Sequence, residues 1–164
     1  MARVSVLLPF HNAGPGLDEA IASIARQTYS DLELLLIDNG STDGGTSIAM
    51  TWVERDPRIR LLHEPRIGIA HALNTGLAQA EGRYIARMDA DDVSLPERLE
   101  KQVAYLEMYP EVGALGTRTA FATTVERSSG MRCFVDWQNT ILTPHDHYVK
   151  RFVDAPLAHP TVLF

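Results

Sequence analysis

Short apolar runs alternate with amphipathic stretches along the first two thirds of the chain. The runs Val4–Leu8, Leu32–Ile37 and Ile59–Leu62 consist mostly of branched aliphatic residues bounded by polar or turn residues, which is typical of buried strands. A fourth run, Arg83–Met88, leads directly into an acidic cluster. Between and after these runs, apolar residues recur at helical spacing within residues 20–25, 48–53, 69–80 and 98–106.

This alternation predicts right-handed crossovers and an α/β fold, a three-layer α/β/α sandwich with a mostly parallel central sheet. Later in the chain the pattern is weaker, and Ser128–Asp136 shows no clear periodicity. We expect a strand at Val112–Thr117, which could extend to Val125, a short helix at Asp146–Val153 and the start of another strand at Ala158–Phe164. Because the last residues are apolar, we expect a fragment truncated within an element.

Composition and charge narrow the class of protein. With 45% hydrophobic and 22% charged residues, the chain has the composition of one globular domain, residues 1–164. A net charge of −6 argues against a nucleic-acid partner, because phosphate binding needs clustered Lys and Arg. The one cysteine, Cys133, excludes an internal disulfide and fits a reducing compartment. No apolar run approaches the ~20 residues of a membrane span, and we expect no secretory leader because the first strand begins almost at Met1.

Polar residues follow three predicted strands at their carboxyl ends: His11-Asn12, Asp38-Asn39 and Asp89–Asp92. In a parallel sheet these ends share one edge, where ligands bind. Carboxylates this close repel one another unless a divalent cation lies between them, and Mg²⁺ or Mn²⁺ often shares its ligand shell with substrate phosphates. The Asp-x-Asp of Asp89 and Asp91 therefore predicts a metal that holds a diphosphate.

Five blocks carry a more specific signal: residues 4–12 (VSVLLPFHN), 23–28 (SIARQT), 33–44 (ELLLIDNGSTDG), 68–77 (GIAHALNTGL) and 82–92 (GRYIARMDADD). In this order and spacing the chain resembles the family 2 glycosyltransferases of the GT-A fold. The similarity runs from Val4 to about Leu106 and returns at His159–Thr161. A lone Asp-x-Asp is weak evidence, whereas the five blocks together are highly specific.

The resemblance implies a nucleotide-diphosphate sugar donor and a cofactor, Mn²⁺ or Mg²⁺. It places Pro9, Phe10 and Asn12 in the nucleotide-binding pocket. Asp38 is expected to accept a hydrogen bond from the base, most often uracil, and Asp89 to face the ribose or the sugar.

The same resemblance assigns the metal to Asp91, which would hold it against the diphosphate. Asp89 is the second expected ligand, and Asp92 could support either residue. Arg66 lies where the family often places a basic residue near the donor, although the spacing there varies.

The family also implies an inverting direct displacement, which needs an Asp or Glu base to deprotonate the acceptor hydroxyl. In the family, that base lies in an acidic pair downstream of a segment like His159–Thr161, so we expect it beyond Phe164. The late carboxylates Asp136, Asp146 and Asp154 lack the expected context. We therefore predict that this chain binds donor but transfers sugar poorly or not at all.

Simpler interpretations stay open for several residues. Asp89 and Asp91 could cap the next helix from a solvated turn, and Asp38 could be an ordinary turn residue. His11 is assigned to packing or solvent contact, since the family varies at this position.

Other functions are weighed beside the leading one. A sugar nucleotidyltransferase would carry a Gly-rich basic loop after the first strand, but Pro9–Asn12 contains no Lys or Arg. A non-catalytic nucleotide-binding module of the same fold is the third hypothesis. Family analogy alone suggests a glycan or lipid-linked acceptor, a role in polysaccharide biosynthesis, and a cytoplasmic location that could include the inner face of the membrane. A sheet edge exposed by truncation could also pair two copies into a homodimer.

Overall fold

The structure is a computed structural model that describes residues 4–122 and 129–164. Within these residues, four strands form one parallel sheet in the spatial order β3-β2-β1-β4. β1 pairs with β2 along its whole length, so that Phe10 lies opposite Asp38 at the carboxyl ends. The strands are β1 (Val4–Phe10), β2 (Leu32–Asp38), β3 (Ile59–His63) and β4 (Tyr84–Arg87).

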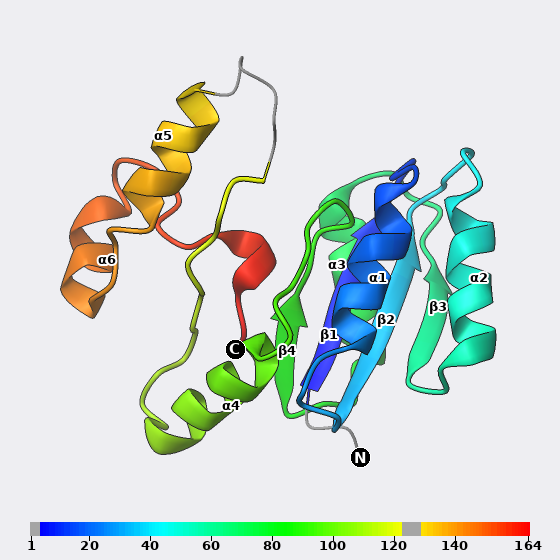
Figure 1. Ribbon diagram of the computed structural model, residues 1–164, viewed down its shortest axis with the longest axis horizontal. Coiled ribbons are helices and arrows are strands. Elements are labelled where there is room, and N and C mark those ends of the chain that lie inside the picture. The colour runs from blue at the N-terminus through cyan, green and yellow to red at the C-terminus, as the bar shows by residue number, and fades with distance from the viewer. Residues whose placement is uncertain (1–3, 123–128) are drawn as a thin grey trace.

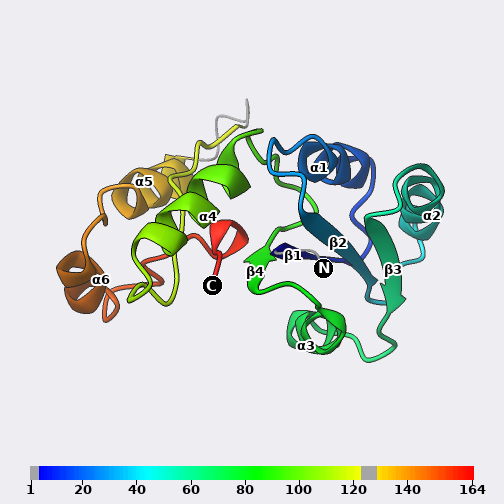
Figure 2. The ribbon, with the colours of Figure 1, turned by 90° about the horizontal axis from the view of Figure 1, so that it is seen from below.

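Helices cover both faces of this sheet, which confirms the predicted three-layer α/β/α sandwich. In Figure 2, α1 (Gly16–Ala25) and α2 (Gly45–Arg55) lie on one face and α3 (Ile69–Gln79) lies on the other. α4 (Arg98–Met108) lies beside β4 at the edge of the sheet. All four helices fall where helical spacing predicted them, within a few residues at each end.

Alternation along the strands divides the core into two clusters. Val6 and Leu8 of β1 point towards α1 and pack with Ile21 in the larger cluster. Leu7, between them, points the other way and packs with Ala72 of α3 in the smaller cluster. Because the central strands β1 and β2 are buried on both faces, they are nearly continuous apolar runs.

A buried polar network closes the amino-terminal end of the sheet. Ser5 Oγ donates a hydrogen bond to Glu33 Oε1 at 2.5 Å, and Arg60 Nη1 pairs with Glu33 Oε2 at 3.2 Å. The Gly82 N–H donates to Ser5 Oγ at 2.7 Å. The chain passes so close here that a Cβ at Gly82 would lie 2.5 Å from the Ser5 nitrogen. Position 82, two residues before β4, is therefore restricted to glycine by β1.

The predicted strands of the carboxyl-terminal segment are largely wrong. Val112–Thr117 and Ala158–Phe164 contribute only isolated antiparallel bridges, in which Leu163 lies between Ala86 and Leu115. Residues 159–161 form a 3-10 turn instead, and Pro160 within it has no N–H for a strand ladder. No strand is formed in residues 118–122, and the expected extension from 123 to Val125 lies outside the described residues.

The outer edge of β4 is nevertheless covered. The Ile85 N–H donates to the Phe164 carbonyl at 2.7 Å, and the Phe164 N–H donates to the Ile85 carbonyl at 3.0 Å. The Arg87 N–H donates to the Val162 carbonyl at 2.9 Å. Residues 162–164 thus occupy the hydrogen-bonding groups of β4 that face away from β1, so this edge of the sheet is not left bare.

Two further helices, α5 (Ser129–Gln138) and α6 (Pro144–Lys150), extend away from the sheet on the β4 side (Figure 1). α5 falls in a stretch where the sequence pattern weakened and no helix was predicted. α6 begins and ends earlier than the expected helix at Asp146–Val153, because Thr143 and Asp146 form a capping box with Pro144 in the first turn.

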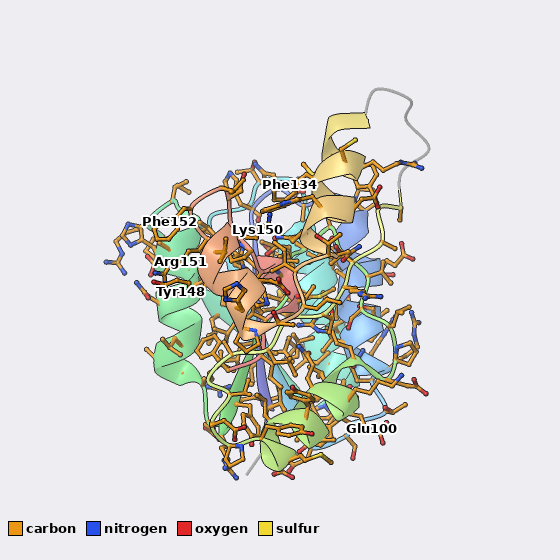
Figure 3. All side chains as sticks on the ribbon, turned by 90° about the vertical axis from the view of Figure 1, so that its left-hand side faces the viewer. Glu100, Phe134, Tyr148, Lys150, Arg151 and Phe152 are labelled. Carbon is orange, nitrogen blue, oxygen red and sulfur yellow. The ribbon has the colours of Figure 1, made fainter. Side chains whose placement is uncertain are left out.

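The carboxyl-terminal helices leave large side chains in solvent. Figure 3 shows Tyr148 and Phe152 on this side of the molecule, where they are 60% and 78% exposed. Among the described residues, no helix is both long enough and apolar enough to cross a membrane.

Candidate functional site

A cavity of about 380 Å³ opens at the carboxyl ends of β1 and β4. Three segments form its walls: the end of β1 with the loop after it, the start of α3, and the end of β4 with the acidic run. This is the edge at which parallel α/β sheets bind ligands. Its lining residues are Pro9, Phe10, His11, Asn12, Ala13, Ile69, Arg87, Asp89, Ala90 and Asp91.

The loop after β1 is fastened to the loop after β2 through Asn12. Asn12 has a left-handed backbone with φ of 51°, which asparagine tolerates better than most residues. Its Oδ1 accepts hydrogen bonds from the Thr42 N–H at 2.8 Å and the Thr42 hydroxyl at 3.3 Å, and its own N–H donates to Ser41 Oγ at 3.2 Å. The Asn12 side chain therefore shapes the cavity wall as well as lining it.

Asn39 is a second fastening point. Its Nδ2 donates to the carbonyls of Glu64 and Arg66 at 2.9 and 2.8 Å, and its Oδ1 accepts from the Gly68 N–H at 2.8 Å. The His11 Nδ1, 2.8 Å from the Asn39 carbonyl, donates to it in the tautomer that carries a proton there. His11 was assigned to packing or solvent contact. It lines the cavity and connects the cavity wall to Asn39.

Asp38 lies at the end of β2, outside the cavity lining, and is 4% exposed. Its Oδ1 accepts from the Ser41 N–H at 2.8 Å, and its Oδ2 accepts from the Thr46 hydroxyl at 2.6 Å. Burial raises the pKa of this carboxyl, but the hydrogen bonds from Thr46 and Ser41 outweigh burial and lower the pKa overall. Asp38 is thus an ionised residue that orders the loop after β2.

The lowered pKa predicts a pH-dependent effect of Asp38→Asn. A carboxylate whose pKa falls on folding contributes stability above its unfolded pKa of about 3.9 and loses it as the pH drops through the folded value. We expect Asp38→Asn to cost about 1–2 kcal/mol at pH 7 and progressively less below pH ~4. Urea unfolding at pH 7, 5, 4 and 3 would measure this difference, with exposed Asp31→Asn as the control. An equal cost at every pH would contradict the ionic role.

Arg66 lies outside the cavity lining and is held by Glu64. Its Nε donates to Glu64 Oε1 at 2.9 Å and its Nη2 donates to Glu64 Oε2 at 3.0 Å. The Thr75 hydroxyl donates to the same carboxylate at 2.5 Å. The hydrogen bonds from Arg66 and Thr75 lower the pKa of Glu64 strongly. One edge of the Arg66 guanidinium therefore holds the segment between β3 and α3, while the side chain is 67% exposed.

The three carboxylates of the acidic run have different surroundings. Asp89 accepts a hydrogen bond from Arg87 Nη2 at 3.0 Å. Asp91 lines the cavity, is exposed, and accepts no hydrogen bond from any described residue. Asp92 lies outside the lining, and desolvation together with the charges of Asp91 and Asp89 raises its pKa. Asp91 is thus the carboxylate most available to a cation.

A metal ion fits this arrangement only with help from a ligand. Within residues 4–122 and 129–164, no group of three or more His, Cys, Asp or Glu side chains is arranged to hold a metal. Mg²⁺ and Mn²⁺ are commonly bound by one or two carboxylates plus substrate phosphates. The free Asp91 carboxylate, with Asp89 two residues away, is a donor set of that kind.

A buried arginine supports the acidic run from behind. Arg98 of α4 donates from Nη2 to the Arg87 carbonyl at 2.8 Å and from Nε to Gln102 Oε1 at 3.1 Å. Burial lowers the pKa of Arg98 to about 10, while the charge of Asp92 acts in the opposite direction. The residue remains a cation at neutral pH. It holds the end of β4 and offsets part of the repulsion among the aspartates.

The structure brings together five of the predicted site residues and leaves three outside. The predicted residues Asp38, Arg66 and Asp92 do not line the cavity. Arg87, His11 and Ile69 line it without having been predicted as site residues. Strand alternation could have revealed Arg87, because residues 87 and 89 point to the same side of an extended chain. The predicted residues that do line the cavity are Pro9, Phe10, Asn12, Asp89 and Asp91.

Comparisons with known proteins agree with this geometry. The family model described as "Glycosyl transferase family 2" matches residues 5–159. The chain is 43% identical over 117 residues to the putative glycosyltransferase EpsE of Bacillus subtilis, a match covering 70% of this chain and 42% of EpsE. It is 34% identical over 146 residues to the uncharacterized glycosyltransferase YibD of Escherichia coli, a match covering 82% of this chain and 42% of YibD.

Solved structures show the same fold. The mannosyltransferase PcManGT of Pyrobaculum calidifontis, in complex with GDP-Man and Mn²⁺, is 35% identical with a TM-score of 0.67 over 72% of this chain and 36% of its own. S. aureus TarS 1-349 in complex with UDP gives a TM-score of 0.66 at 23% identity, over 77% of this chain and 38% of its own. The chain spans less than half the length of these relatives.

Proposed function

Because this chain belongs to glycosyl transferase family 2, we propose that its cavity binds a nucleotide-diphosphate sugar for transfer to an acceptor hydroxyl. The observation that carries the proposal is the position of Asp91, a carboxylate without a partner among the described residues in a cavity at the carboxyl ends of β1 and β4. The complex of PcManGT with GDP-Man and Mn²⁺ supports it.

We assign the metal, Mn²⁺ or Mg²⁺, to Asp91 and Asp89, with Asp92 close enough in the chain to assist either. When bound, the metal would neutralise negative charge on the departing diphosphate. The protein supplies the carboxylates, and the loop fastened by Asn12 and Asn39 fixes the opposite wall before ligand arrives. A wall that is already ordered loses little conformational freedom on binding.

The nucleotide is assigned to the side of the cavity formed by Pro9 and Phe10. We propose UDP as the preferred nucleotide, with Asp38 accepting a hydrogen bond from the base. Each oxygen of Asp38 already accepts one hydrogen bond but has a second lone pair, so a further donor is chemically acceptable. Arg66 lies outside the cavity lining, and its Nε and Nη2 already donate to Glu64, so we assign it no direct contact with the donor.

The transfer itself is proposed to invert the anomeric centre by direct displacement. The late carboxylates offer no evident base: Asp146 caps α6 together with Thr143, and Asp154 accepts from the Ala155 N–H at 2.6 Å. We propose that residues 1–164 form one donor-binding domain and that the base belongs to a region beyond Phe164 in a longer protein. The 164-residue chain would then bind donor and transfer little sugar.

The remaining expectations concern the context of the reaction. We propose a glycan or lipid-linked acceptor, a role in polysaccharide biosynthesis, and a cytoplasmic location with peripheral attachment to the inner face of the membrane. Self-association through a bare β4 edge is less favoured, because residues 162–164 already occupy that edge.

The test is a calorimetric titration of the 164-residue chain with UDP and with GDP, each with and without Mn²⁺. The proposal predicts binding that requires Mn²⁺, with UDP bound more tightly. Binding that is indifferent to the metal would contradict the assignment of Asp91 and Asp89. Pyrophosphate-dependent exchange into a nucleoside triphosphate would instead indicate a nucleotidyltransferase.

A further inference from the structure

Arg87 is the arginine whose buried side-chain nitrogen lacks a hydrogen-bond partner among the described residues. A guanidinium has five N–H donors. Arg87 donates one described hydrogen bond, to Asp89, and its Nε–H is buried with no partner among the described residues. By contrast, the Nε–H groups of Arg58, Arg66 and Arg98 each donate to a carboxylate or side-chain amide oxygen of the protein.

Arg87 also lies in the wall of the cavity. Its side chain lines the cavity and is 23% exposed. Among the described lining residues, it is the one with a permanent positive charge. Its backbone is fixed on both sides, because its N–H donates to the Val162 carbonyl and its carbonyl accepts from Arg98. On this fixed backbone, the hydrogen bond from Nη2 to Asp89 holds the guanidinium at the cavity wall.

The negative charges at the cavity favour a cationic side chain in its wall. Asp89 and Asp91 bring two negative charges to the wall, and the diphosphate of a nucleotide sugar brings about two more at neutral pH. A divalent metal offsets only part of this sum. Guanidinium groups bind phosphate oxygens through two parallel hydrogen bonds, which a point charge cannot reproduce.

We propose that Arg87 binds the diphosphate of the donor directly, using the donors that the protein leaves free. This inference rests on the proposed function. Asp89 then has two partners, since it holds the guanidinium at the cavity while it faces the metal. As the sugar–phosphate bond breaks and its electron pair moves to the diphosphate, Arg87 stabilises the growing negative charge.

A purely structural role for Arg87 makes a different prediction. If the side chain served only to orient Asp89, its removal would affect every ligand that depends on Asp89 and would have no effect once Asp89 is gone. If Arg87 binds phosphate, its removal should weaken the binding of each ligand in proportion to the number of phosphates that the ligand carries.

The experiment compares nucleoside, nucleoside monophosphate and nucleoside diphosphate binding to the wild type, Arg87→Met and Arg87→Lys. The ligand set is uridine, UMP and UDP, or the guanosine series if GDP binds better, in the presence of Mn²⁺. For Arg87→Met we expect the diphosphate to bind about tenfold more weakly or worse, and the nucleoside to change less than about twofold. Arg87→Lys should recover part of the loss. The matched control is Arg83→Met, an exposed arginine on the same segment that pairs with Glu107 at 4.0 Å and lies outside the cavity.

A double-mutant cycle with Asp89→Asn separates direct from indirect action. A loss of UDP affinity on adding Arg87→Met to Asp89→Asn supports direct phosphate binding, and no further loss overturns it. Equal weakening of nucleoside and diphosphate, or no weakening at all, also overturns it. If the wild type binds neither UDP nor GDP with Mn²⁺, the proposed function fails first and this inference fails with it. Circular dichroism of each variant establishes that it is folded.

Discussion

Replacing Asp91 with Asn is expected to remove the Mn²⁺-dependent part of nucleotide binding, with affinity falling about 100-fold. The reason is that Asp91 lines the cavity and its carboxylate accepts no hydrogen bond from any described residue, so its charge is free for a metal. Titration calorimetry with UDP or GDP would measure the loss. Removing the metal from the wild type with a chelator should bring its affinity to the level of the variant.

The same substitution should leave the fold intact. Asp91 supports no neighbouring group, and its charge helps to raise the pKa of Asp92, so its removal relieves repulsion. We expect the free energy of unfolding to be unchanged or slightly higher. Asp31→Asn, on an exposed aspartate before β2, is the matched control and should bind as the wild type does. Metal-dependent binding that survives in Asp91→Asn would exclude this residue as a ligand.

The largest effect on stability is expected from Gly82→Ala. A Cβ at this position would lie 2.5 Å from the Ser5 nitrogen, 2.7 Å from Ser5 Oγ and 2.8 Å from the Val4 carbonyl carbon. The backbone of β1 lies in the centre of the sheet and cannot move aside without disturbing its pairing with β2 and β4. We expect a loss of roughly 2–4 kcal/mol, measured by urea unfolding.

Gly113→Ala is the matched control for this substitution. A Cβ at Gly113 meets nothing within 4 Å, so the added methyl group costs no contact. We expect its stability to lie within about 0.5 kcal/mol of the wild type. If Gly82→Ala were equally mild, β1 and the chain before β4 could separate more easily than their hydrogen bonds indicate.

The first two thirds of the fold could be predicted because local pattern and global arrangement agree there. The central strands β1 and β2 are buried on both sides, as a parallel sheet covered by helices requires, and the helices that cover them bury one apolar stripe. The carboxyl-terminal segment lacks this agreement. The residues of α5 from 130 to 138 are exposed or half-buried, so its apolar side chains do not join the core, and Leu163 takes part in isolated bridges that depend on partners distant in sequence.

The candidate site could be predicted as far as strand ends determine it. Residues after β1 and β4 meet because parallel strands end at one edge, so Phe10 and Asp91 share a cavity. Side-chain partners within that edge depend on rotamers and loop paths, which a pattern does not contain. The Thr46 hydroxyl donates a hydrogen bond to Asp38, eight residues before it in the chain. The Thr75 hydroxyl donates one to Glu64, eleven residues before it. The functional roles of the site residues stay predictions until the titrations above are made.

The strand order has a consequence for how the chain acquires its site during folding. Ser5 meets Glu33 across a separation of 28 residues but meets Gly82 across 77. Closing the longer loop costs more chain entropy, and contacts between distant residues form slowly. We therefore expect β1 and β2 to associate first and β4 to join the opposite side of β1 later. The cavity would exist only after that last pairing. Nucleotide and metal should therefore bind the completed sheet and should not accelerate the earlier steps of folding.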